Sequence, residues 1–295
     1  MTRVDLHRHL EGTIRVSTVA ETCRARGLAV PPLEVLEPTP LLTALQRFDG
    51  FRLAVTGPAA VERIFREAVE DAVAEGLTAL ELRYSPYTLA RAAGMEVRAL
   101  VELLAGLPAT VELPVSLVVI VSRSRGLEAA WEVVRAVEDV EVAGADFASD
   151  EVRVPTRAFQ EVAAAFHARG LPITVHTGEG TPPAAIREAL ALPGVLRLGH
   201  AVSLADDESV MAEVVERGVV VECCPTSNVR VGLASYQDHP AQRMAEAGVP
   251  LVLCTDDPTL FRVDLEHELK VARGWGWSEH RIEDCMKRAE SARFC

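Results

Sequence analysis

A seven-residue stretch near the start of the chain, Arg3-Val4-Asp5-Leu6-His7-Arg8-His9, contains the pattern that decides the fold. We predict that it forms a β-strand, in which residues two apart face the same side. The imidazoles of His7 and His9 then point together, whereas Arg8 faces outward among the helices and needs a carboxylate partner. Two neutral imidazoles at this spacing can hold one metal ion. The stretch therefore predicts a strand that ends in a metal site.

Seven further apolar runs bounded by turn signals also predict β-strands. Most are rich in Val, Leu and Ile with little polar alternation, which is the pattern of parallel strands covered on both faces. Amphipathic stretches between them, such as 59–75, 203–217 and 240–247, predict helices. The eight predicted strands are Arg3–His9, Ala79–Ser85, Val115–Ser122, Val140–Phe147, Leu171–His176, Val195–Ala201, Gly218–Cys224 and Val249–Thr255.

Reactive residues at the ends of these strands help to decide between two possible folds. Alternating strands and helices are compatible with an open doubly wound sheet or with a closed barrel. In barrels, polar groups from many strands converge at the C-terminal strand ends. Here four predicted strands end in such groups: His7 and His9, then His176, then His200, then Asp256 and Asp257. We therefore predict one (β/α)8 barrel, a single domain spanning residues 1–295, with residues 30–45 above its mouth.

Composition excludes several other classes of protein. Hydrophobic residues make up 49% of the chain and charged residues 25%, as in globular proteins with a sizeable core. A formal net charge of −13 argues against a nucleic-acid partner, since such affinity is carried by Lys and Arg. No signal peptide or run of ~18 apolar residues is visible, so we expect no membrane association. Six cysteines without C-x-x-C spacing favour free thiols and a cytoplasmic location.

Glu179 and the pair Asp256-Asp257 need separate consideration, because ordinary explanations exist for them. Glu179 follows His176 after a turn at Gly178, and solvent exposure would be its default. Adjacent aspartates are most often a helix cap or a solvated turn. However, four of the eight histidines fall at strand ends, which is hard to obtain by chance. That distribution favours one catalytic site.

Seven motifs follow one another along the chain in the order HRHLEG, LRYSP, ASDE, HTGE, LGHAV, CCPTSN and CTDDP. Together they resemble those of the adenosine deaminase family, within the amidohydrolase barrels, and they extend from residue 5 to residue 258. The resemblance implies a zinc-dependent hydrolase that acts on the C–N bond of a cyclic amidine. It would convert a 6-aminopurine nucleoside to the 6-oxopurine and release ammonia. One zinc ion would be held by His7, His9, His176 and Asp256.

The resemblance also implies roles for the other site residues. His200 would accept or orient the water proton with assistance from Asp256, and Glu179 would protonate purine N1. Asp257 would bind purine N7, and His9 would face the substrate as well as the metal.

Two departures from the family pattern concern the substrate, which we expect to be a small purine nucleoside or base. Ser149 stands where the nucleoside deaminases carry a glycine that approaches purine N3. Glu11 stands where an aspartate commonly meets the ribose 5′-hydroxyl. The longer Glu11 would suit a modified 5′ end, as in 6-aminodeoxyfutalosine, or free adenine. The motif LRYSP at 82–86 resembles the nucleoside deaminases more than the adenine deaminases.

Two alternatives lie further away. Other amidohydrolases cleave lactones or phosphoesters, usually with a bridging lysine, but Lys270 and Lys287 are the only lysines and neither ends a predicted strand. A non-enzymatic deaminase-like binding protein would have lost a ligand or an acid, and every expected position is filled.

Overall fold

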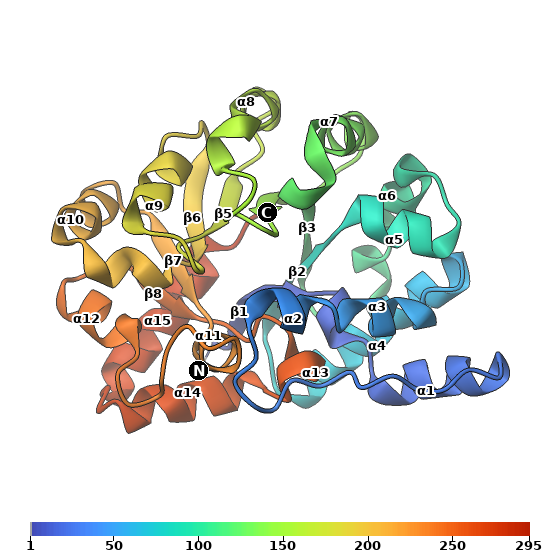
Figure 1. Ribbon diagram of the computed structural model, residues 1–295, viewed down its shortest axis with the longest axis horizontal. Coiled ribbons are helices and arrows are strands. Elements are labelled where there is room, and N and C mark those ends of the chain that lie inside the picture. Colours follow the sequence, from blue (N-terminus) through green and yellow to red (C-terminus); the bar gives the residue numbers. More distant parts are fainter. Residues whose placement is uncertain (1) are drawn as a thin grey trace.

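The computed structural model describes residues 2–295 and contains an eight-stranded parallel sheet whose strands follow the chain order (Figure 1). The predicted (β/α)8 barrel is confirmed. Its first and last strands are joined through residue 256, whose backbone N donates to the carbonyl of His7 at 2.7 Å and whose carbonyl accepts from His9 N at 2.9 Å. The strands are β1 (Val4–His9), β2 (Ala79–Tyr84), β3 (Val115–Ser122), β4 (Gly144–Ala148), β5 (Ile173–Thr177), β6 (Val195–His200), β7 (Val220–Cys223) and β8 (Leu251–Leu253).

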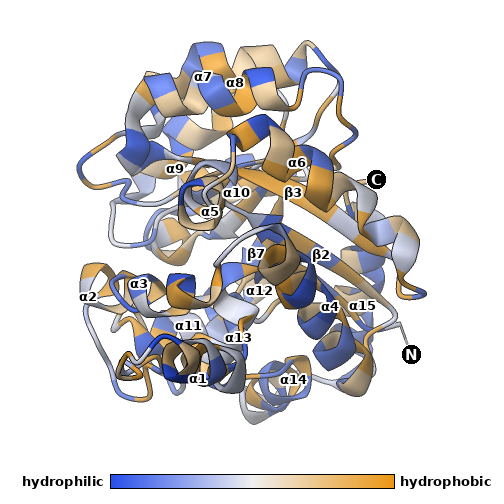
Figure 2. Ribbon diagram, turned by 90° about the vertical axis from the view of Figure 1, so that its right-hand side faces the viewer, coloured by the Kyte–Doolittle hydropathy of each residue, from blue (hydrophilic) through white to orange (hydrophobic). Residues whose placement is uncertain are grey.

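Helices connect the strands and cover the outside of the barrel (Figure 2), and their buried apolar residues belong to the hydrophobic core. No helix in residues 2–295 is long and apolar enough to cross a membrane. The α-helices are α1 (Val16–Ala25), α2 (Leu41–Leu45), α3 (Phe48–Phe51), α4 (Pro58–Ala74), α5 (Pro86–Ala93), α6 (Val97–Gly106), α7 (Gly126–Ala136), α8 (Gln160–His167), α9 (Pro183–Leu190), α10 (Glu208–Glu216), α11 (Pro225–Arg230), α12 (Pro240–Glu246), α13 (Pro258–Phe261), α14 (Leu265–Gly274) and α15 (Glu279–Ala292). Short 3-10 turns are η1 (Glu11–Thr13), η2 (Arg52–Ala54), η3 (Pro108–Thr110), η4 (Arg123–Arg125), η5 (Thr156–Phe159) and η6 (Val202–Asp206).

Two strands differ in length from the sequence prediction. Strand β4 begins at Gly144 rather than Val140, because α7 runs to Ala136 and the chain uses the next seven residues to return to the sheet. Strand β8 has only three residues. Beyond it, Asp256 takes a left-handed conformation, with φ +63°, that ends the extended chain.

Charged side chains, not only apolar ones, fill the inside of the barrel. Arg197 of β6 pairs with Glu81 of β2 and, at 2.9 Å, with Glu222 of β7, and all three are buried. The Phe294 ring lies 3.5 Å from the Arg197 guanidinium carbon, and its backbone N donates to Glu81. Arg197 hydrogen-bonds to Glu81 and forms an ion pair with Glu222, so each buried charge has a partner, as burial in a low-dielectric interior requires.

Arg8 faces outward from β1 and pairs with a carboxylate, as the sequence predicted. It donates to Glu75 beside α4 through two hydrogen bonds, of 3.1 and 2.8 Å, and to Asp5 at 3.0 Å. The Arg8 and Asp5 side chains are almost completely buried.

Replacing Arg8 by methionine should destabilise the fold by about 3–5 kcal/mol, because Asp5 would remain buried without its counter-charge. Urea denaturation would measure the loss in free energy of unfolding. Arg98→Met, which removes an exposed ion pair with Glu102, is the control and should change stability by less than about 1 kcal/mol. Equal effects of the two variants would contradict this account of Arg8.

Candidate metal centre and active site

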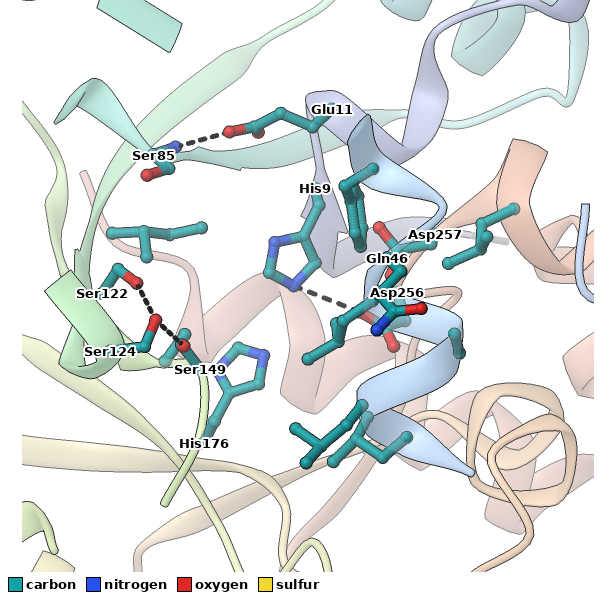
Figure 3. Close-up of a pocket in the computed structure, with 18 of the residues that line it drawn as sticks. His9, Glu11, Gln46, Ser85, Ser122, Ser124, Ser149, His176, Asp256 and Asp257 are labelled. Atoms are coloured by element: carbon teal, nitrogen blue, oxygen red, sulfur yellow. Dashed lines mark hydrogen bonds and ion pairs between the residues drawn. The ribbon is translucent and has the colours of Figure 1, made fainter. Parts of the chain in front are cut away.

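A cavity of about 360 Å³ lies at the C-terminal ends of the strands, and residues 41–45 of α2 cover part of it. Figure 3 shows His9, His176, Asp256 and Asp257 around it; His9 comes from β1, His176 from β5, and the two aspartates follow β8. The structure thus brings together the residues that the sequence singled out. Those that line the cavity are His9, Glu11, Ser149, His176, Glu179, His200, Asp256 and Asp257, and the buried His7 lies beneath it.

Imidazole nitrogens and one carboxylate form a compact cluster at the base of the cavity. One ligand atom each from His7, His176, His200 and Asp256 lie within 4.8 Å of one another. Nε2 of His7 and Nε2 of His176 are 3.1 Å apart. His9 belongs to the same cluster, because its Nε2 lies 3.1 Å from Oδ1 of Asp256. Four candidate ligands are therefore mutually close, among them His200, and His9 adjoins them through Asp256.

Two carboxylates behind the imidazoles decide which ring nitrogen is free. Nδ1 of His7 lies 2.7 Å from Glu222, and Nδ1 of His176 lies 2.9 Å from Asp146. A carboxylate accepts hydrogen bonds, so in the neutral rings Nδ1 carries the proton and Nε2 carries a lone pair. Two such lone pairs at 3.1 Å repel each other unless a proton or a metal ion is shared between them.

Asp256 also has an oxygen atom that is free to bind a cation. Its Oδ2 accepts a 2.6 Å hydrogen bond from Ser227, but its buried Oδ1 has no hydrogen bond. Nε2 of His9 and Nε2 of His7 lie 3.1 and 3.4 Å from that oxygen, too poorly aligned to donate to it. Nitrogen and oxygen atoms that converge without hydrogen-bonding are what a transition-metal ion requires. The donor set fits a metal.

Arg83 of β2 holds the two supporting carboxylates in place. It is buried and donates to Asp146 at 3.0 Å and to Glu222 at 3.0 Å. Burial alone would raise the pKa of Glu222, but Arg83 and Arg197 hold it well below its usual range. Glu222 therefore stays ionised and can accept a hydrogen bond from Nδ1–H of His7.

Glu179 lies at the rim, opposite the histidines. Its Oε1 is 3.9 Å from Nε2 of His200, and its side chain is 13% exposed. The turn that carries it is fixed by Glu151, which accepts from the backbone N of Gly178 at 3.2 Å and of Glu179 at 2.6 Å. Burial raises the pKa of Glu179, as a proton donor at neutral pH requires.

Two more carboxylates that border the cavity each have one oxygen without a hydrogen bond, Oδ1 of Asp257 and Oε2 of Glu11, and both oxygens are buried. The other oxygen of Glu11 accepts from Ser85 N at 3.0 Å. Oδ1 of Asp257 lies against Gly12, where a side chain would collide with it, so glycine is required there.

Ser149 adopts the backbone conformation expected of the glycine it replaces, with φ +81°. This left-handed conformation costs a non-glycine residue about 1–2 kcal/mol. The hydroxyl donates to Ser124 at 2.7 Å, and Ser124 contacts Ser122 at 3.2 Å (Figure 3). The serine side chain is thus held against η4, directly after β3.

Sequence reasoning did not identify the residues that orient the site. Glu222 and Asp146 orient His7 and His176, and Asn228 lies 2.9 Å from Nδ1 of His200. One signal was available: charged residues interrupt otherwise apolar strands at Arg83, Asp146 and Glu222. Charged side chains inside a predicted barrel need hydrogen-bond partners, and the imidazole of a metal ligand is one such partner.

A parallel barrel with a metal-compatible cluster at its C-terminal strand ends defines the chain as a barrel amidohydrolase. The family model described as adenosine deaminase matches residues 2–295, and the chain belongs to that family.

Similar proteins agree with this assignment. The chain is 31% identical to the adenosine deaminase of Shewanella loihica, over 99% of this chain and 93% of the relative. Among solved structures, an N6-methyl-AMP deaminase from Arabidopsis thaliana has a TM-score of 0.86 and 28% identity, covering 100% of this chain and 92% of the other. An adenine deaminase from Arthrobacter aurescens has a TM-score of 0.91 and 23% identity, covering 99% and 94%, and shares the fold.

Replacing Asp146 by asparagine should lower metal affinity about 10–100-fold, because the Nδ1 proton of His176 loses its ionised acceptor. Competition with a fluorescent chelator would measure the affinity for zinc. The control is Asp139→Asn, whose carboxylate is 81% exposed, and its affinity should not change. Unchanged affinity in a folded Asp146→Asn protein would exclude this supporting role.

Proposed function

We propose that the protein is a zinc-dependent hydrolase that removes the 6-amino group of a purine nucleoside, with adenosine as the simplest substrate. The observation that carries the proposal is the unpaired Oδ1 of Asp256, which faces the Nε2 atoms of His7 and His9 while Glu179 stands opposite. We assign His7, His9, His176 and Asp256 as the metal ligands. A zinc ion held there supplies an activated water, whose pKa falls from ~15.7 to about 7.

Glu179 is positioned to make the purine ring accept a nucleophile. In its protonated form it donates its proton to N1, which leaves C6 electron-poor. The Glu151 hydrogen bonds to the backbone of residues 178 and 179 keep this acid at the rim. Addition of water oxygen to C6 then yields a tetrahedral carbon that carries both oxygen and the amino group.

His200 moves the proton that the water loses. Its Nε2 lies 3.9 Å from Oε1 of Glu179 and 3.9 Å from Oδ2 of Asp256, between the acid and the water site. It accepts a water proton and returns it to the amino group. As the C6–N bond breaks and ammonia leaves, the proton of the C6 hydroxyl passes to the Glu179 carboxylate. The 6-oxopurine remains, the acid is regenerated, and one water is consumed for each ammonia released.

Asp257 and Glu11 supply binding rather than proton transfer. The unpaired Oδ1 of Asp257 is suited, as a carboxylic acid, to donate to purine N7, and the unpaired Oε2 of Glu11 to accept from a sugar hydroxyl. The backbone of Ser149, in its glycine-like conformation, leaves room for the purine N3 edge.

Zinc-loaded protein should deaminate at least one member of a panel containing adenosine, 2′-deoxyadenosine and adenine, and a chelator should abolish the reaction. Absorbance in the purine band and ammonia release would follow turnover. Re-addition of zinc after chelation is the control for irreversible loss of structure. Inactivity of the zinc-loaded protein toward every member of the panel, and also toward AMP as a 6-aminopurine with a charged 5′ end, would rule out the deaminase assignment and favour a binding protein.

Replacing Glu179 by glutamine should reduce kcat by more than about 10²-fold, the usual contribution of a general acid, and leave zinc bound. His176→Ala should lose the metal together with the activity. Metal content and turnover are measured on the same samples, so the two variants separate acid from ligand. An active Glu179→Gln protein would show that the acid is misassigned.

A further inference from the structure

Three arginines line a hollow beside the active-site cavity. The hollow has a volume of about 260 Å³, and we call it the arginine hollow; it is lined by Arg52, Tyr87, Thr88, Arg91, Ala92 and Arg125. The two spaces are neighbours, since Arg52, Thr88 and Arg125 border both.

The arginine hollow has three cationic side chains and no carboxylate in its lining. Within residues 2–295, neither Arg91 nor Arg125 makes an ion pair, and Arg52 pairs only with the exposed Asp49. Unpaired arginines occur elsewhere on the described surface, but here two of them, Arg91 and Arg125, line one hollow together with Arg52. The lining of the hollow is therefore cationic, beside the active-site cavity.

The three guanidinium groups come from three different connections. Arg52 belongs to η2, Arg91 to α5 and Arg125 to η4, so their convergence is produced by the barrel rather than by one basic segment. The Arg91 guanidinium carbon lies 5.2 Å from the centre of the Tyr87 ring. Burial and the nearby charge of Arg125 lower the pKa of Arg52, whereas Glu11 raises it. Arg52 and Arg125 repel each other unless an anion joins them.

Glu11 lies at the sugar-binding side of the cavity. It accepts a hydrogen bond from Ser85 N. In Figure 3, Glu11 and Ser85 lie on the side of the cavity away from His176. Its free Oε2 is suited to a sugar hydroxyl, and its charge interacts with Arg52. A nucleoside with C6 at the metal cluster and its sugar at Glu11 would direct its 5′ end toward the arginine hollow.

We propose that the arginine hollow binds an anionic group, a phosphate or a carboxylate, carried at the 5′ end of the 6-aminopurine substrate. Guanidinium groups bind both anions through paired hydrogen bonds. The proposal rests on the proposed function, since it extends the substrate of the same site. It explains why a protein of strongly negative net charge keeps unpaired arginines at this position.

Steady-state kinetics with four compounds would test the substrate class. Adenosine, adenine, AMP and adenosine 5′-carboxylic acid are compared on the zinc-loaded protein. One charged hydrogen bond corresponds to about tenfold or more in kcat/KM, so AMP or the 5′-carboxylic acid should exceed adenosine by at least that factor. Preference for AMP identifies the anion as a phosphate, and preference for the acid identifies a carboxylate. Equal kcat/KM for adenosine and both anions would overturn the proposal.

Variants of the arginines would show whether the hollow causes the preference for an anionic substrate. Arg125→Ala and Arg91→Ala should each lower the ratio of kcat/KM for the preferred anion to kcat/KM for adenosine by about tenfold. Arg135→Ala, an equal charge change on the exposed surface of α7, should leave the ratio unchanged. Arg91 and Arg125 are exposed, so their truncation should not unfold the protein. A ratio that is the same in all three variants would also overturn the proposal.

A binding measurement separates failure of this proposal from failure of the proposed function. If no compound is turned over, the deaminase assignment fails, but calorimetry with IMP and inosine still tests the hollow. IMP binding tighter than inosine, and weakened about tenfold by Arg125→Ala, would support the anion site. Equal affinities for IMP and inosine would exclude it.

Discussion

The site depends on one buried arrangement, in which Arg83 joins the carboxylates of Glu222 and Asp146 behind the imidazoles of His7 and His176. Each carboxylate accepts a hydrogen bond from Nδ1–H of one ring, so the Nε2 lone pair of that ring faces the cavity. Without these carboxylates the rings could turn or change tautomer. With them, the donor atoms of a metal site are oriented before any metal binds.

This arrangement also explains why the inside of the barrel is charged. Burying carboxylates is unfavourable unless each one is paired, and here the pairing extends from Arg83 through Glu222 to Arg197 and Glu81. The chain of ion pairs links the metal cluster to the opposite end of the barrel, where Phe294 covers Arg197. Stability and the orientation of the site therefore depend on the same residues.

Local strain is concentrated at the same end of the barrel. His200, Asp256 and Ser149 all have positive φ, although none is a glycine, and each lies at or just beyond a strand end. Left-handed backbone at such positions persists only when the surroundings impose it, and it is typical of functional sites. Here it ends the strand geometry and aims side chains at the cavity.

The sequence alone determined the strands and the reactive residues at their ends, because apolar runs covered on both faces and histidines next to turns are local patterns. It also showed that Arg8 needs a carboxylate, but not which one, since Glu75 lies 67 positions away. Only the tertiary structure decided which distant residues meet: Glu222 with His7, Asp146 with His176, and the arginines of three connections in one hollow. The physical reason is barrel closure, which sets the register between strands far apart in the chain and hence which side chains face each other across the interior.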